Sequence, residues 1–96
     1  MRISKIRIQI KDAERALETE IRLFNGHKVD MATANCFQDY SVRVVCAEKL
    51  RISKERARVH LESLGIVYNQ FPEFITPVEA GRRLTNYGRF NRFYRA

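Results

Sequence analysis

Apolar residues recur with a helical period along the first quarter of the chain. Seven of them fall on one stripe at about 100° per residue, namely Ile3, Ile6, Ile10, Ala13, Leu17, Ile21 and Phe24. This period predicts one long amphipathic helix over residues 2–25, with Gly26 as its C-cap. A strand over residues 6–10 would account for Ile6, Ile8 and Ile10 alone, so the pattern favours the helix.

The same stripe is close to a heptad repeat, which leaves two uses for it open. The helix can pack on the body of its own chain, or it can pair with the same helix of a second subunit. A helix of about 36 Å is long for a domain whose radius of gyration should be about 12 to 13 Å, and this favours a homodimer. The predicted dimer interface consists of Ile3, Ile6, Ile10, Leu17, Ile21 and Phe24.

Residues 44–65, VVCAEKLRISKERARVHLESLG, fit two short helices separated by a tight break. Asp30 can cap a short preceding helix over residues 31–39, and Ser41 can cap the first helix of the pair. The break lies at residues 51–53, after which Ser53 caps the second helix. Ala57, Leu61 and Leu64 give that second helix its buried face.

The run AEKLRISKERARVHLESLGIV resembles the helix-turn-helix of bacterial and phage winged-helix regulators. In those proteins an alanine, a leucine, an isoleucine-serine turn and a basic helix ending in His-Leu-x-x-Leu-Gly-Ile recur in that order. The resemblance covers about a fifth of the chain and departs from the family at Arg51, where the family usually has glycine. It implies a second helix that enters the major groove of DNA, with Arg56 and Arg58 facing the bases and Ser53 and Lys54 on phosphate.

Beyond Gly65 the pattern of the chain changes. The stretch IVYNQFPEFI has β-branched and aromatic residues around a polar turn, which predicts a short β-hairpin where winged-helix proteins carry the wing. Thr76 followed by Pro77 is a helix-start signal. The segment TPVEAGRRL also resembles the one that often follows the wing.

The C-terminal residues interleave arginines with aromatic rings. The arginines can clamp phosphates, while the rings either stack on bases or return to the core. The complete set of residues predicted to contact DNA comprises Ser53, Lys54, Arg56, Arg58, Val59, Arg82, Arg83, Arg89, Arg92 and Arg95.

Length and charge are consistent with a small polyanion-binding domain. The 96 residues predict a single domain over 1–96, divided into a helix (2–25), a helix-turn-helix with wing (30–75) and a C-terminal helix with a tail (76–96). The net charge is +7, and residues 51–96 carry nine Lys or Arg against four Asp or Glu. All nine except Lys54 are arginine, which favours a nucleic-acid partner.

Several other classes are not expected. No catalytic motif and no phosphate-binding glycine loop occurs, so the chain is predicted not to be an enzyme and to need no cofactor. The cysteines and histidines lie nine or more residues apart, unlike zinc ligands. No apolar run reaches the about 20 residues of a membrane span, and the N-terminus lacks a secretory signal. A cytoplasmic protein is therefore expected.

The predicted fold class is mainly α (α+β), a winged-helix-like helix-turn-helix with a long N-terminal amphipathic helix and a short β-hairpin. The predicted function is a small basic protein that binds double-stranded DNA as a dimer, as a transcriptional regulator or an accessory factor of phage or mobile-element type. One alternative is a phage-type interaction protein that inhibits a host nucleoprotein complex, a polymerase or a CRISPR-like immune complex. The other is an RNA-binding component.

Overall fold

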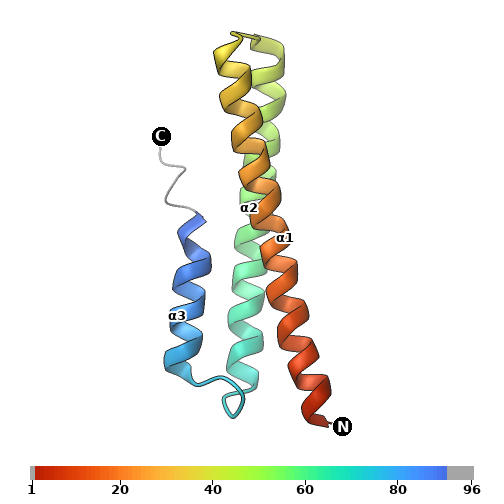
Figure 1. The fold of residues 1–96 in the computed structure, drawn as a ribbon, viewed down its shortest axis with the longest axis vertical. Helices are drawn as coiled ribbons and strands as arrows, with labels where there is room; N and C mark the ends of the chain where they lie inside the picture. Colours follow the sequence, from red (N-terminus) through yellow and green to blue (C-terminus); the bar gives the residue numbers. More distant parts are fainter. Residues whose placement is uncertain (1, 91–96) are drawn as a thin grey trace.

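The computed structural model describes residues 2–90 and contains three α-helices in that range. Helix α1 spans Arg2–Cys36, α2 spans Tyr40–Gln70 and α3 spans Pro77–Gly88. Helices α1 and α2 form a long antiparallel hairpin, and α3 runs beside the half of it that lies farthest from the α1–α2 turn (Figure 1). The molecule is elongated, with extents of 54 × 24 × 15 Å.

The two long helices pack through residues that recur on one face, seven or ten apart in α1 and three, four or seven apart in α2. The buried positions of α1 are Ile10, Leu17, Phe24 and Ala34. Those of α2 are Cys46, Leu50, Ser53, Ala57, Leu64 and Tyr68. Such spacing keeps one seam of each helix turned to its partner over many turns, as in a coiled coil. The predicted N-terminal helix is therefore confirmed, although it extends past Gly26 to Cys36.

Each helix that follows a turn begins at a side-chain cap. Asp39 caps α2, and its Oδ1 accepts a hydrogen bond from the Val42 backbone N–H at 3.2 Å. Thr76 caps α3, where its Oγ1 accepts from the Glu79 N–H at 3.2 Å and proline occupies the next position. The helix start predicted at Thr76 is confirmed, whereas the α2 cap is Asp39 and not Ser41.

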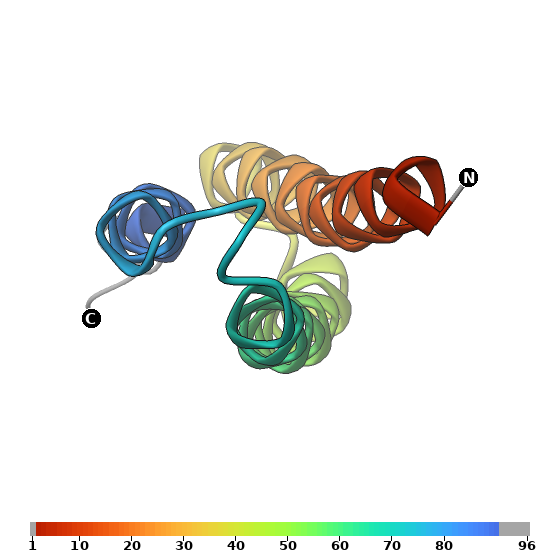
Figure 2. The same ribbon diagram turned by 90° about the horizontal axis from the view of Figure 1, so that it is seen from below.

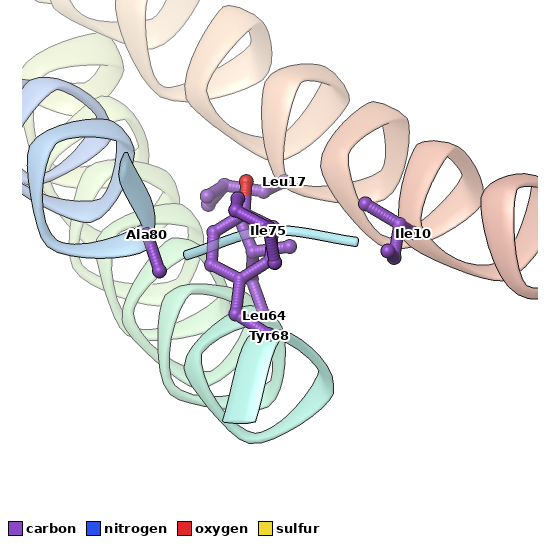
Figure 3. Packing of buried hydrophobic residues seen from close by; sticks show 6 residues of the cluster. All are labelled: Ile10, Leu17, Leu64, Tyr68, Ile75 and Ala80. Atoms are coloured by element: carbon purple, nitrogen blue, oxygen red, sulfur yellow. The ribbon is translucent and has the colours of Figure 1, made fainter. Parts of the chain in front are cut away.

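Two apolar clusters hold the three helices together. The first joins all three helices and the loop before α3 through Ile10, Leu17, Leu64, Tyr68, Ile75 and Ala80 (Figure 3). The second contains Phe24, Leu50, Ala57 and Phe90. In the second cluster the rings of Phe24 and Phe90 meet edge to face, with centroids 5.7 Å apart. Phe90 is 5% exposed, so this ring of the C-terminal segment packs in the core.

The predicted helix-turn-helix is wrong, because residues 51–53 lie inside one uninterrupted helix, α2. Ser53 has the same helical phase as Leu50 and Ala57 and faces α1 with them, 4% exposed. Its hydroxyl donates to the Leu50 carbonyl at 3.2 Å, so the buried oxygen has a partner without ending the helix. Packing of this seam outweighs the turn signal of Ile52 and Ser53.

The predicted wing is wrong as well. No strand occurs among residues 2–90, and residues 66–70 are the last turn and a half of α2. Tyr68, 1% exposed, is buried against α1, and the burial of this large ring favours helix despite the β-branched neighbours. Residues 31–36, expected to start a separate short helix, likewise continue α1. The protein is therefore mainly α without the winged-helix arrangement.

Candidate nucleic-acid interface

A row of cations follows the outer flank of α1. Arg7, Lys11, Arg15 and Arg22 are exposed, and their spacing of four, four and seven residues places them along one side of the helix. The row is about 22 Å long at the rise of an α-helix. None of these four side chains has an ion-pair partner within residues 2–90. We refer to these four residues as the basic ridge.

The ridge borders the seam between α1 and α3, which contains two open hollows. One hollow, of about 340 Å³, is lined by Arg7 and Lys11 of the ridge together with Glu14, Glu73 and Arg83 among others. The second hollow, of about 390 Å³, lies farther along the seam. Its polar lining consists of Glu18, Arg22, Asn25, Asn86 and Arg89. Cations of both helices therefore meet along this seam.

Hydrogen bonds to Glu14 fix α3 in this position. The Tyr68 hydroxyl donates to Glu14 Oε2 at 3.1 Å, Arg83 Nη1 donates to the same oxygen at 3.2 Å, and the Tyr87 hydroxyl at 3.4 Å. The single hydroxyl proton of Tyr87 is shared between this oxygen and Glu18 Oε1, the nearer acceptor at 2.8 Å. Burial and the Glu14 carboxylate raise the pKa of Tyr68 to about 12, and burial with the Glu18 hydrogen bond raises the pKa of Tyr87 further. Both hydroxyls therefore stay protonated at neutral pH and donate to these carboxylates.

The residues predicted to read DNA from α2 do not share a surface. Ser53 is buried, and Lys54 is partly buried. Arg56 and Arg58 differ by about 200° around the helix, so they lie on opposite flanks of α2. Arg58 pairs with Glu55 at 3.5 Å, whereas Arg56 lines a hollow on the other flank with Glu20 and His27 of α1. The hydrophobic member of the set, Val59, is 51% exposed between these flanks.

The predicted arginine contacts near the C-terminus have different surroundings. Arg82 and Arg83 both bind the Glu79 carboxylate, and these hydrogen bonds lower the pKa of Glu79 to about 2. Arg89 is exposed at the end of α3, without an ion-pair partner in residues 2–90. Arg92 and Arg95 lie outside the described residues.

The stripe predicted as a dimer interface packs against the rest of its own chain. Ile10, Leu17 and Phe24 are buried in the two clusters, while Ile6 and Ile21 are partly buried at their edges. Only Ile3, 55% exposed, remains open at the N-terminal end of the stripe. A second subunit would therefore have to use another surface.

No group of three or more potential metal ligands converges within residues 2–90. His60 Nε2 lies 3.7 Å from Glu20 Oε1, and His27 Nδ1 lies 3.8 Å from Asp30 Oδ2, so the two histidines belong to separate pairs. Cys36 is exposed at the end of α1 and Cys46 is buried. None of the three helices is long and apolar enough to cross a membrane over the residues described.

The sequence contained a signal for the basic ridge, because its cations recur at helical spacing in a segment already predicted as a helix. The clustering of arginines after residue 51 drew the prediction to the other half of the chain instead. Comparisons of the chain with protein-family models, with curated proteins and with solved structures found no match.

Proposed function

We propose that the protein binds nucleic acid, duplex DNA in the first place, through the basic ridge of α1 and the adjoining seam with α3. The observation that supports this most is the row of four exposed cations that have no ion-pair partner in residues 2–90. Cations that the fold itself does not neutralise release counterions from a phosphate backbone at little cost to the protein. The net charge of +7 favours the same class of partner.

The mode of binding that we propose is contact with phosphates. A straight row of arginine and lysine side chains on one helix suits the backbone of a duplex, which fixes position without reading sequence. Single-strand binding would need free rings on which bases stack. Beside the seam, Tyr87 and Phe90 are engaged with Glu18 and with Phe24. Phe74, which lines the first hollow, is partly buried against the first apolar cluster. The duplex is therefore the better partner for the described part of the chain.

This role is one of binding and not of catalysis, and we place it in the cytoplasm. Homodimer formation remains part of the proposal, although not through the buried stripe of α1. As a second candidate, the protein docks on a nucleoprotein complex. The exposed apolar residues around the α1–α2 turn favour it, since large apolar patches are typical of protein interfaces. They include Phe37 at 79%, Tyr40 at 74% and Val44 at 55% exposure.

Electrophoretic or fluorescence titrations of duplex DNA over a range of salt concentrations test the proposal. In the ridge variant, Lys11, Arg15 and Arg22 are each replaced by alanine. Each lost phosphate contact should reduce the slope of log affinity against log salt by about 0.9, so the slope should fall by up to about 2.7. The matched control replaces Arg43, Arg51 and Arg58 by alanine, which removes the same charge from α2.

The control should keep the slope and most of the affinity. Equal losses in both variants would mean that net charge alone attracts DNA, which would contradict a binding site on the ridge. Tighter binding of single-stranded RNA than of duplex DNA would assign the protein to the RNA-binding class. Absence of any nucleic-acid binding by the wild type would leave docking on a protein as the function.

A further inference from the structure

One flank of α2 bears a column of exposed apolar residues. Val45, Ile52, Val59 and Ile66 lie seven residues apart and are 53%, 43%, 51% and 60% exposed. Ile52, for example, lies about 100° around the helix from Ser53 and about 140° from Ala57, two residues of the seam that faces α1. Val45 and Ile52 line open hollows beside α1, and all four residues remain exposed. We refer to these four residues as the outer column.

The outer column belongs to an internal repeat of seven residues. The segments VCAEKLR, ISKERAR and VHLESLG each begin with a β-branched residue and have glutamate at the fourth position, and the first two have a basic residue at the fifth. The sixth position, occupied by Leu50, Ala57 and Leu64, faces α1 and explains the inner seam. The first position has no such role within residues 2–90, although β-branched residues are unfavourable on an exposed helix surface.

Opposite charges flank the outer column on its two sides. Glu48, Glu55 and Glu62 lie about 60° to one side of it, and Lys49 and Arg56 about 40° to the other. Within the part of the chain that the structure describes, Lys49, Arg56 and Glu62 have no ion-pair partner. An apolar column between an acidic and a basic flank is complementary to a second copy of itself.

We propose that two copies of the chain associate through the outer columns, with the two α2 helices parallel and in register. A two-fold axis parallel to the helices sets the basic flank of each copy against the acidic flank of the other, Lys49 near Glu48 of the second copy and Arg56 near its Glu55. An antiparallel pair would instead set like flanks together.

This interface is independent of nucleic-acid binding, and it agrees with the position of the other surfaces. The basic ridge borders the seam between α1 and α3 and so lies away from the outer column. Figure 2 shows that α1 and α3 leave part of the surface of α2 open. Helix α3 contacts a different flank of α2, where Leu84 lies 3.7 Å from the position of a Cβ at Gly65. The outer column therefore stays accessible in the folded monomer.

Sedimentation equilibrium at tens of micromolar tests the interface. The wild type should sediment as a dimer, and the double variant Ile52→Glu, Val59→Glu as a folded monomer with unchanged helical circular dichroism. The matched control is Ile8→Glu, Val78→Glu, which adds the same charge at exposed apolar positions away from the column (57% and 84% exposed). The control should remain dimeric. A monomeric wild type, or a column variant as dimeric as the control, would overturn the proposal.

A charge exchange between the flanks tests whether the charged flanks pair across the interface. Variant A carries Lys49→Glu and Arg56→Glu, and variant B carries Glu48→Lys and Glu55→Lys. In a parallel pair each variant alone sets like charges together and should be a monomer, whereas an equimolar mixture should restore the dimer, because both flanks then meet opposite charge. Because A then has two acidic flanks and B two basic flanks, A and B attract each other in either orientation. Failure of the mixture to dimerise would overturn the pairing of the flanks, and the orientation is tested by the disulfide.

A disulfide tests the register and the orientation of the two helices. In the Cys36→Ser background, Val59→Cys should form a disulfide-linked dimer on mild oxidation, because residue 59 would face its own counterpart across the axis. In an antiparallel pair centred on the column, residue 59 would face residue 52 instead. A protein that is dimeric in sedimentation but forms no disulfide through residue 59 would contradict the in-register arrangement.

Discussion

The two halves of the α1–α2 hairpin are built from the same helices but differ in what covers them. In the base half, made of residues 3–24, 50–70 and α3, large side chains such as Leu17, Leu64 and Tyr68 are almost completely buried. In the turn half, residues 25–49, only Ala34 and Cys46 are buried. Apolar residues there remain open to solvent, among them Val29, Phe37, Tyr40, Val42 and Val44.

The third helix causes this difference. Two helices alone can bury only the narrow seam between them, whereas α3 covers a second flank of both and closes the core around Tyr68 (Figure 3). Stability in such a molecule should decrease from the base half to the turn half, because local opening follows the number of buried apolar contacts. Three substitutions and a change of pH test this gradient, in order of decreasing effect on stability.

Truncation of the base core should have the largest effect. Leu64 is fully buried in the first cluster, which joins all three helices. Leu64→Ala should therefore lower the free energy of unfolding by about 2–5 kcal/mol. The matched variant in the turn half is Val44→Ala, because the Val44 side chain is 55% exposed. This variant should change the free energy of unfolding by no more than about 0.5 kcal/mol. Urea denaturation measures both. Similar losses in the two variants would contradict the proposed gradient.

Loss of the Glu14 carboxylate should release α3 from the base half. Its side chain is 17% exposed and accepts from Tyr68, Tyr87 and Arg83, so Glu14→Ala leaves these donors without that acceptor. The free energy of unfolding should fall by about 1–3 kcal/mol. Asp12→Ala is the control, since Asp12 is an exposed acid on the same helix. If both variants are equally stable, the hydrogen bonds to Glu14 do not hold α3.

Alkaline pH should weaken the same contact by a smaller amount. The pKa of Tyr68 is about 12 in the folded protein and 10.0 for a tyrosine without these contacts, so the folded state holds this proton more tightly. The stability from this proton is complete below pH 10 and is lost as the pH rises toward 12. Between these values the wild type should lose stability more steeply than Tyr68→Phe. If the free energy of unfolding falls equally with pH in the two proteins, deprotonation of Tyr68 is not the cause of the loss.

Periodicity in the sequence predicted the elements whose signals agree with their surroundings. The stripe through Ile10, Leu17 and Phe24 predicted the first helix, and Thr76 with Pro77 predicted the start of the third. Glycine was a weaker guide. Gly26 lies within α1, and a Cβ there would meet nothing within 4 Å, so neither the backbone nor the packing requires a break at this position.

The helix-turn-helix prediction failed because it relied on the turn-forming residues 51–53 and not on the periodicity of the whole of α2. Ser53 looks like a cap when residues 51–53 are taken alone, but it continues the series Leu50, Ser53, Ala57 over the length of α2. The seven-residue repeat that starts at Val45 and Ile52 was visible in the sequence and predicts one continuous helix. Helical spacing in the sequence was enough to put the cations of the basic ridge on one side of the first helix, but only the fold determines which cations have acidic partners.

The mildest test concerns the first turn of α3, on which the contrast between the two halves depends. Thr76→Ala removes the acceptor of the Glu79 N–H and should lower the free energy of unfolding by about 1 kcal/mol. Thr85→Ala is the control, because the Thr85 hydroxyl bonds the Gly81 carbonyl within the helix, where alanine is favourable. Hydrogen exchange should quicken in α3 of the Thr76 variant and stay unchanged in residues 32–49, which lie beyond the contacts of Asn25 and Met31 with the end of α3 and Phe90. Faster exchange in the turn half as well would mean that the hairpin unfolds as one unit, and that α3 stabilises its whole length.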